Sequence, residues 1–251
     1  MSSSIWTRCA GDSEIRALRL APWRAVEAQH LVSTRKLVAN SEEQILLEEL
    51  IEGAKPPSQS ASRLHYLLAT PFRYPPLRSG SRFGTRHERG IWYGSETRET
   101  ALAEVAYYRL VFLEGSSADL GTVTTQLTLF TVTVRSSFGV DLTLSPFVAY
   151  HRAIASRVSY GDAQTLGAAM RAAGVDLVRY PSARDARGGV NVAVFAPEVF
   201  GRGKPRELET WHCTATAALV EFAKRDYFGR QLFAFERQLF LMKGRLPAPS
   251  L

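Results

Sequence analysis

The chain has 251 residues, of which 45% are hydrophobic and 22% charged, as is typical of a soluble protein with one large domain or a domain and an appendage. Two cysteines exclude a disulfide framework and a four-thiolate metal site, and no apolar stretch reaches the roughly 18 residues of a membrane span. The net charge of +7 comes from basic residues spread along the chain without a nucleic-acid-binding motif, so we expect an anionic small molecule or an acidic protein as partner and no direct nucleic-acid binding. The first residues lack a signal-peptide pattern, which favours a cytoplasmic protein.

The first sixty residues are expected to form a helical extension packed on the core, followed by a main domain over residues 61–251. Ser41-Glu42-Glu43-Gln44 is a capping-box pattern, and apolar residues at helical spacing follow it. Gly53 and the Pro56-Pro57 pair would end this helix. The polar run over 58–62 then suits a connector between the two parts.

Three elements are predicted in the first half of the main domain. Residues 71–84, rich in proline, glycine and arginine, predict a loop, and residues 90–94 predict a short aromatic strand. Ser95 or Thr97 can cap the next helix, which is expected to run to about Phe112. Its predicted buried stripe consists of Ala101, Val105, Tyr108 and Phe112.

The second half supplies most of the predicted strands. An alternating strand over 122–135 has a phase slip at Leu129-Phe130 that indicates a bulge, and a helix over 162–173 follows. The remaining predicted strands cover 175–180, 190–196, the stretch around Trp211 and 231–235. Because helices and strands mix without a regular βαβ repeat, we expect an α+β fold with a mixed, mostly antiparallel sheet and flanking helices.

Three residues of different type follow one another at a spacing of eleven: Arg82, Tyr93 and Glu104. They fall in a glycine-rich loop, at a strand end and inside a helix, so side chains from three separate elements can converge on one site. Arginine binds phosphate through a planar charged fork, tyrosine offers an apolar face with a polar tip, and glutamate is an acceptor-only anion. This combination suits a ligand that has both a phosphate and a ribose.

For a dinucleotide such as NAD, each of these residues has a chemical role. Arg82 would bind the pyrophosphate, and Gly84 would let the backbone approach the ligand closely. Tyr93 would orient the nicotinamide half. Glu104 would stabilise the oxocarbenium character that develops on the ribose when the N-glycosidic bond breaks.

A later loop, which joins two predicted strands between Tyr180 and Asn191, carries a hydroxyl, two arginines and two glycines. Loops of this composition at strand ends are common ligand sites. Ser182 would hydrogen-bond a carboxamide or a phosphate, and Asn191 is a further candidate for substrate binding. No histidine is placed to activate Ser182 as a nucleophile, and none has metal-ligand spacing, so we expect no metal.

Taken singly, each of these residues has an ordinary structural explanation. Arg82 could pair with a surface carboxylate, and Glu104 could be a solvated helix residue. Tyr93 could be a core residue, and Ser182 a turn residue or helix cap. The joint pattern favours a site, although a basic module that binds nucleic acid without catalysis stays open as an alternative.

The chain resembles the RES-domain family, the toxins of bacterial RES–Xre toxin–antitoxin pairs. The family pattern is a glycine-flanked arginine before an aromatic residue, a tyrosine at a strand end, a helix with Ala-x-x-Glu, and a late Pro-Ser loop before an apolar strand. Here these motifs are Arg82-Phe83, Tyr93, Ala101 to Glu104, and Pro181-Ser182. They occur in order over about 64–196.

The resemblance implies an ADP-ribosyltransferase-like core, with residues 61–251 as the catalytic domain of an NAD-degrading toxin. NAD would be the substrate, water or inorganic phosphate would attack it, and no prosthetic group would be bound. Some relatives instead transfer ADP-ribose to a protein such as a nucleotide-metabolism enzyme, and this alternative stays open. The expected protein partner is an Xre-like antitoxin, and a homodimer is also left open.

The family also uses an arginine upstream of the glycine-flanked one. Three residues compete for this place here, namely Arg24, Arg63 and Arg73. The additional helix before the main domain blurs the alignment. We favour Arg73, in the segment Pro71-Phe72-Arg73-Tyr74, with Arg24 as a second substrate-binding candidate.

Overall fold

The computed structural model describes residues 4–27, 42–43, 46–47, 50, 64–74, 76, 78–201, 203–226 and 229–248. The helix predicted after Ser41 lies largely outside these residues, and the connector over 58–62 lies wholly outside them. None of the described helices combines the length and the apolar character that a membrane crossing requires.

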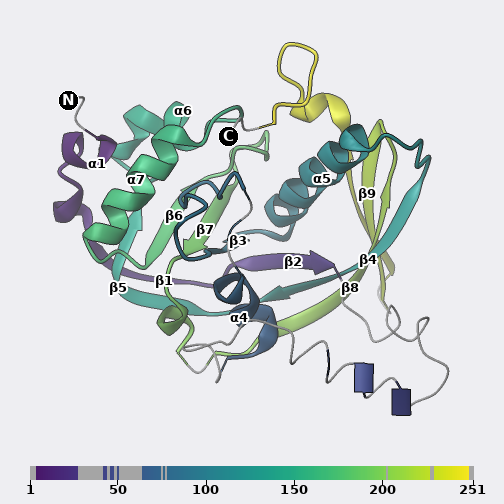
Figure 1. Ribbon diagram of the computed structural model, residues 1–251, viewed down its shortest axis with the longest axis horizontal. Helices are drawn as coiled ribbons and strands as arrows, with labels where there is room; N and C mark the ends of the chain where they lie inside the picture. The colour runs from purple at the N-terminus through teal and green to yellow at the C-terminus, as the bar shows by residue number, and fades with distance from the viewer. Residues whose placement is uncertain are drawn as a thin grey trace.

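In the described part of the chain, ten strands form one sheet with helices packed on it (Figure 1). The strands are β1 (Arg16–Leu20), β2 (Trp23–Glu27), β3 (Trp92–Ser95), β4 (Val123–Thr131), β5 (Val134–Asp141), β6 (Leu177–Pro181), β7 (Val190–Val194), β8 (Arg206–Ala215), β9 (Leu219–Asp226) and β10 (Gly229–Glu236). The α-helices are α1 (Ile5–Arg8), α4 (Tyr66–Arg73), α5 (Arg98–Gly115), α6 (His151–Ile154) and α7 (Gly161–Ala172). Shorter 3-10 turns are η1 (Gly11–Glu14), η2 (Phe147–Tyr150), η3 (Pro197–Phe200) and η4 (Arg237–Phe240).

The strand order is β1-β5-β6-β7-β3-β2-β4-β8-β9-β10. β5 and β6 run parallel, and the other paired strands run antiparallel. The predicted α+β class, with a mixed and mostly antiparallel sheet, is confirmed.

Residues 16–27, expected to belong to a helical extension, are two strands of the sheet instead. β1 pairs with β5, and β2 lies between β3 and β4. The sequence pattern conceals β2 because Arg24 stands inside this central strand, where it lines a cavity. Ile5 and Trp6 of α1 are also buried in the core. Whether the chain divides near residue 60 stays a prediction.

β4 and β5 replace the single strand predicted over 122–135. The predicted bulge is confirmed by a register shift between Leu129 and Thr131 in the pairing of β4 with β8. The strand then ends, and the Thr131 hydroxyl donates to the carbonyl oxygens of Ala21 and Pro22 at 3.0 and 3.1 Å. Ala21 and Pro22 separate β1 from β2. The break between β1 and β2 therefore lies beside the break between β4 and β5. β5 therefore pairs with different strands from β4.

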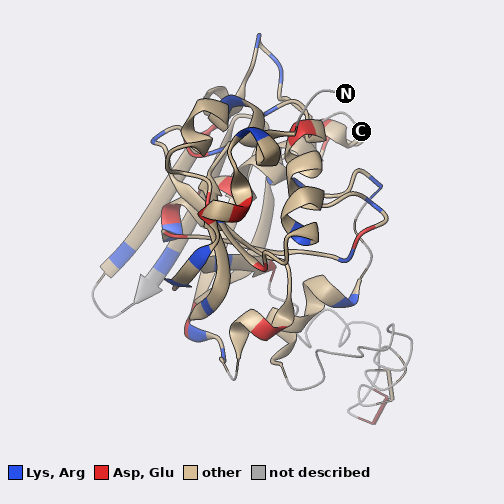
Figure 2. Cartoon of the chain, turned by 90° about the vertical axis from the view of Figure 1, so that its left-hand side faces the viewer, with Lys and Arg blue, Asp and Glu red and all other residues tan. Residues whose placement is uncertain are grey.

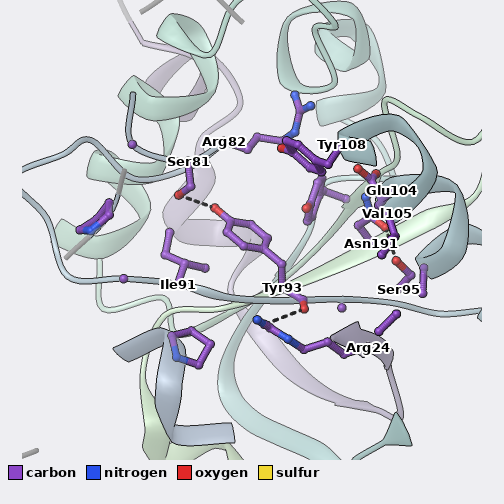
Figure 3. Close-up of a pocket in the computed structure, with 18 of the residues that line it drawn as sticks. Arg24, Ser81, Arg82, Ile91, Tyr93, Ser95, Glu104, Val105, Tyr108 and Asn191 are labelled. Carbon is purple, nitrogen blue, oxygen red and sulfur yellow. Dashed lines mark hydrogen bonds between the residues drawn. The ribbon is translucent and has the colours of Figure 1, made fainter. Parts of the chain in front are cut away.

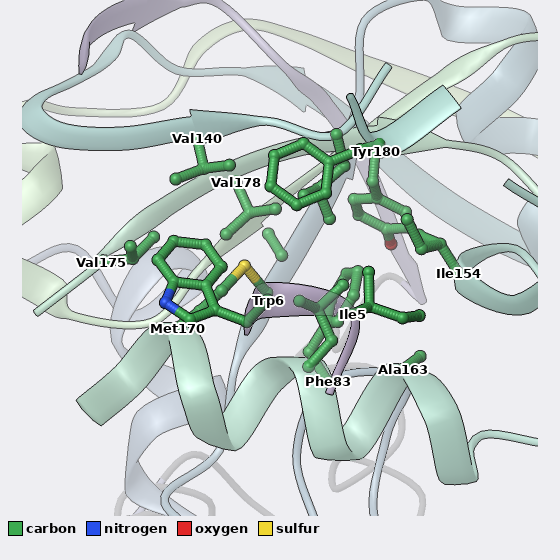
Figure 4. Close-up of a cluster of buried hydrophobic side chains, with 14 of the residues drawn as sticks. Ile5, Trp6, Phe83, Val140, Ile154, Ala163, Met170, Val175, Val178 and Tyr180 are labelled. Carbon is green, nitrogen blue, oxygen red and sulfur yellow. The ribbon is translucent and has the colours of Figure 1, made fainter. Parts of the chain in front are cut away.

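Helices α5 and α7 cover one face of the sheet, and α4 packs on the other. Figure 4 shows α7 and α1 against β5 and β6, in a cluster that includes Met170 and Val178. α5 packs over β4, β8 and β9 through a cluster that includes Leu102 and Trp211. α4, which takes up residues 71–73 of the predicted loop, packs with η3 around Trp92. Successive residues of a strand face opposite sides, so Trp92 and its neighbour Tyr93 belong to different layers.

α5 starts as predicted but buries a different face. The Thr97 side chain accepts a hydrogen bond from the Thr100 amide at 3.1 Å and caps the helix. Tyr107 is fully buried because the C-terminal segment covers it, with its hydroxyl donating to the Pro247 carbonyl oxygen. Tyr108 and Phe112, predicted to be buried, are 54% and 56% exposed. The covering segment lies 140 residues further along the chain, so helical spacing alone could not locate this contact.

Charged residues of both signs are interspersed along the helices and the strands (Figure 2). Several form ion pairs, such as Arg98 with Glu209 at 3.0 Å and Arg179 with Asp141 at 3.1 Å. On the side shown in Figure 2, the basic residues do not gather into one continuous stripe.

Candidate functional site

A cavity of about 620 Å³ opens between α5, β2, β3 and the glycine-rich loop at 79–82. β2 and β3 pair only at Trp23 and Ser95, so the two strands diverge beside the cavity. Arg82, Tyr93 and Glu104, predicted to share a site, all line this cavity (Figure 3). Its volume is in the range of small-molecule and cofactor sites.

Arg82 lies in a tight turn that Ser81 and Gly84 close by a backbone bridge. A Cβ at Gly80 would lie 2.2 Å from the Gly84 carbonyl oxygen, and Gly80 has φ +69°, so this turn needs glycine. Gly84 itself is not among the residues that line the cavity. Its place is in the turn, and its predicted part in ligand binding stays a prediction.

The Arg82 side chain is only 8% exposed and binds the chain segment at the end of α6. Its Nη1 donates to the carbonyl oxygens of Ile154 and Ser156 at 2.9 and 3.0 Å, and its guanidinium lies 5.0 Å from the centre of the Tyr160 ring. Within the described residues, all hydrogen bonds of Arg82 use Nη1. The other nitrogens of the guanidinium remain for an anionic ligand.

Tyr93 holds the Arg82 turn through its hydroxyl group. The hydroxyl is 2.9 Å from Ser81 Oγ and accepts from the Phe83 amide at 3.2 Å. Burial raises the pKa of Tyr93 to about 12, so the phenol is neutral at physiological pH. Its hydroxyl is thus engaged by the protein, and the role of Tyr93 in orienting the ligand stays a prediction.

Glu104 projects from α5, and one of its two carboxylate oxygens is hydrogen-bonded by the protein. Its Oε1 accepts hydrogen bonds from Ser182 Oγ at 2.7 Å and from Asn191 Nδ2 at 2.6 Å. Asn191 Oδ1 in turn accepts from Ser95 Oγ at 2.6 Å, which fixes the orientation of the amide. Within the described residues no hydrogen bond uses Oε2, so this oxygen remains to accept from, or stabilise positive charge on, a bound molecule.

Ser182 belongs to the network behind Glu104 and is not among the residues that line the cavity. Its Oγ donates to Glu104 and also accepts from the amides of Arg184 and Asp185, both at 3.1 Å. Asp185 accepts from the Thr100 hydroxyl of α5 at 2.8 Å. A Cβ on Gly189 would lie 2.3 Å from both Asp185 Oδ2 and Thr100 Oγ1, so the glycine allows this close contact between loop and helix. Ser182 is therefore placed to orient the carboxylate.

A model of the RES domain family matches residues 58–216, more than half of the chain. The chain belongs to the RES-domain family. No curated protein matches it. Among solved structures it is similar to a chain in the crystal structure of the M. tuberculosis MbcT–MbcA toxin–antitoxin complex, at 16% identity and a TM-score of 0.48, over 84% of this chain and 91% of that one.

The three candidates for the upstream arginine of this RES domain occupy different places. Arg24 lines the cavity, and its Nη1 donates to the Tyr93 carbonyl oxygen at 3.1 Å. Burial lowers the pKa of Arg24 to about 10, because little water is left to solvate its charge. Arg73 ends α4 and is not among the lining residues, and Arg63 lies outside the described residues. Of the two candidates that the structure describes, Arg24 is the one that lines the cavity.

Sequence patterns missed several residues of the RES-domain site. Tyr160, Tyr180 and Tyr108 line the cavity as well. Tyr108 follows Glu104 by four residues, a spacing that places both on one side of a helix and could have identified it. Tyr160 and Tyr180 have no local signal, because only the folded sheet and the segment after α6 bring them to the cavity.

Proposed function

We propose that this RES domain cleaves the bond between nicotinamide and ribose in NAD and acts as the toxin of a bacterial toxin–antitoxin pair. The observation that carries the proposal is the half-engaged carboxylate of Glu104, which shares one cavity with Arg24 and Arg82. Two cations and one oriented carboxylate suit a substrate with a pyrophosphate and a ribose that becomes positively charged during reaction. Membership of the RES-domain family supports the same assignment.

In this proposal Arg82 and Arg24 bind the pyrophosphate, and Glu104 faces the nicotinamide ribose. The bond between ribose C1′ and the pyridinium nitrogen breaks, and its electron pair neutralises the nicotinamide ring as it leaves. Glu104 Oε2 stabilises the positive charge that develops on the sugar, while Ser182 and Asn191 keep the carboxylate in place. An oxygen of water or inorganic phosphate then bonds to C1′, and attacking water loses its proton to solvent.

Purified protein incubated with NAD, with and without inorganic phosphate, tests this function. We expect release of nicotinamide together with ADP-ribose, or with ADP-ribose phosphate when phosphate is the acceptor. Glu104→Gln should lose about 10²–10⁴-fold in rate while keeping its fold. Glu114→Gln, at the exposed end of the same helix, serves as the matched control.

Two results would count against the proposal. One is stable NAD in the presence of well-folded wild-type protein under both conditions. The other is equal NAD consumption by wild type and Glu104→Gln. Label from NAD that stays on a protein band would redirect the activity to protein ADP-ribosylation.

The proposed protein partner is an Xre-like antitoxin, on the strength of the family alone. We expect a neighbouring gene to encode a small helix-turn-helix protein whose co-expression restores growth and cellular NAD. If growth arrest by the wild type persists despite a stable complex with that protein, this pairing is wrong.

A further inference from the structure

Five tyrosines line the cavity, namely Tyr74, Tyr93, Tyr108, Tyr160 and Tyr180. They differ in how much of the ring is accessible to a ligand. Tyr160 and Tyr180 are 8% and 3% exposed, so little of either ring is left for a ligand. Tyr93 supports the Arg82 turn through its hydroxyl. Tyr108 differs, because it lines the cavity and yet leaves 54% of its surface in solvent.

The Tyr108 ring is held in place although it is exposed. Its hydroxyl is 3.2 Å from the Tyr160 hydroxyl, across the gap between α5 and the start of α7 (Figure 3 shows Tyr108 beside Arg82). Its ring contacts the buried Tyr107 ring edge to face at 5.0 Å. On Tyr107, in turn, the Arg184 guanidinium lies 3.4 Å from the ring centre. A ring fixed at its tip and at its edge loses little conformational entropy when a planar ligand stacks on it.

Tyr108 also lies at a suitable distance from the carboxylate. It follows Glu104 by one helical turn, and side chains four residues apart on a helix start about 5–6 Å from each other. Tyr74, the other exposed tyrosine of the cavity, comes from the end of α4, a separate element. A ligand whose ribose meets Glu104 would therefore carry the base attached to that ribose toward Tyr108.

We propose that Tyr108 is the stacking platform for the nicotinamide ring of NAD⁺. This inference rests on the proposed function and names the residue that selects the leaving group. The nicotinamide ring of NAD⁺ is a planar cation, and the electron-rich face of a phenol attracts cations as well as aromatic rings. Because cleavage makes nicotinamide neutral, the attraction weakens in the product state and favours release of the leaving group.

Binding measured in the Glu104→Gln protein, which holds ligands without consuming them, tests this platform. With Tyr108→Leu added, we expect affinity for NAD⁺ to fall about tenfold. Affinity for ADP-ribose, which has no nicotinamide, should change less than twofold. NADH, whose ring is uncharged, should lose less affinity than NAD⁺. Tyr108→Phe, which keeps the ring, should retain most of the affinity for NAD⁺.

Phe112→Leu is the matched control, because Phe112 is an equally exposed aromatic one turn further along α5 that does not line the cavity. It should leave all three affinities unchanged. The platform is refuted if Tyr108→Leu weakens NAD⁺ and ADP-ribose equally, or neither, or if Tyr74→Leu produces the selective loss instead. If the Glu104→Gln protein binds neither NAD⁺ nor ADP-ribose, the proposed function falls together with the platform.

Discussion

The Ser182 hydroxyl donates a hydrogen bond of 2.7 Å to Glu104 Oε1, although the two residues are 78 positions apart in the sequence. The same hydroxyl accepts from two amides of its own loop. Ser182 therefore orients the Glu104 carboxylate, and its bonds to two amides of its own loop hold the serine in place. This geometry predicts that the serine acts by positioning the carboxylate.

Ser182→Ala should lower kcat for NAD by about 10–100-fold and leave KM nearly unchanged, because Glu104 keeps one donor, Asn191, but loses the other. Initial rates over a range of NAD concentrations, from below KM to saturation, measure both parameters. A loss above 10⁴-fold in a folded protein would point to a direct chemical role of the hydroxyl.

Arg24→Met should raise KM for NAD by about 10–100-fold, since a charge-assisted hydrogen bond contributes roughly 1.5–3 kcal/mol. Arg73→Met should change KM by less than twofold, because Arg73 does not line the cavity. The pair of variants is compared under the same assay. The reverse ranking would restore Arg73 as the upstream arginine of the site.

Tyr93→Phe should destabilise the protein at neutral pH, because the Ser81 hydroxyl and the Phe83 amide lose their partner. Burial raises the pKa of Tyr93 from 10.0 to about 12, so the folded state binds its proton more tightly than the unfolded state. The stability that this group contributes is therefore complete below pH 10 and is lost as pH rises toward 12. Urea unfolding of both proteins should show a constant difference in free energy from pH 7 to 9 that narrows above pH 10. A difference that already narrows below pH 9 would contradict this.

Arg184→Lys should lower the melting temperature by roughly 3–8 °C. Arg184 is 3% exposed, stacks on the Tyr107 ring and donates to the Arg157 carbonyl oxygen, and lysine has no planar group to replace these contacts. Arg187→Lys is the control, because Arg187 lies in the same loop as Arg184 but is exposed and forms a surface ion pair with Glu99 of α5. Equal melting temperatures for the two variants would show that Arg184 does not hold the segment after α6.

Much of the site could be predicted from local patterns. The glycine-flanked Arg82, the strand with Tyr93 and the helix with Glu104 each have a signal within a few residues, and all three side chains meet in one cavity. The contact of Ser182 with Glu104 could not be predicted, because it joins a loop to a distant helix. The place of Arg24 in a central strand could not be predicted either, because its charge obscures the strand that carries it.

The sequence by itself determined the class of fold, the cap of α5, the bulge in β4 and the residue types of the site, because turns, caps and hydrophobic periodicity act over a few neighbouring residues. Only the tertiary structure decided that β2 enters the middle of the sheet, that Tyr107 is buried while Tyr108 faces the cavity, and that Ser182 supports Glu104 from behind. These outcomes depend on contacts between segments 69 to 140 residues apart, such as Arg24 with Tyr93 and Tyr107 with Pro247. Pairing between distant strands and coverage by a distant chain segment leave no local periodicity, so such contacts emerge only when the whole sheet has formed.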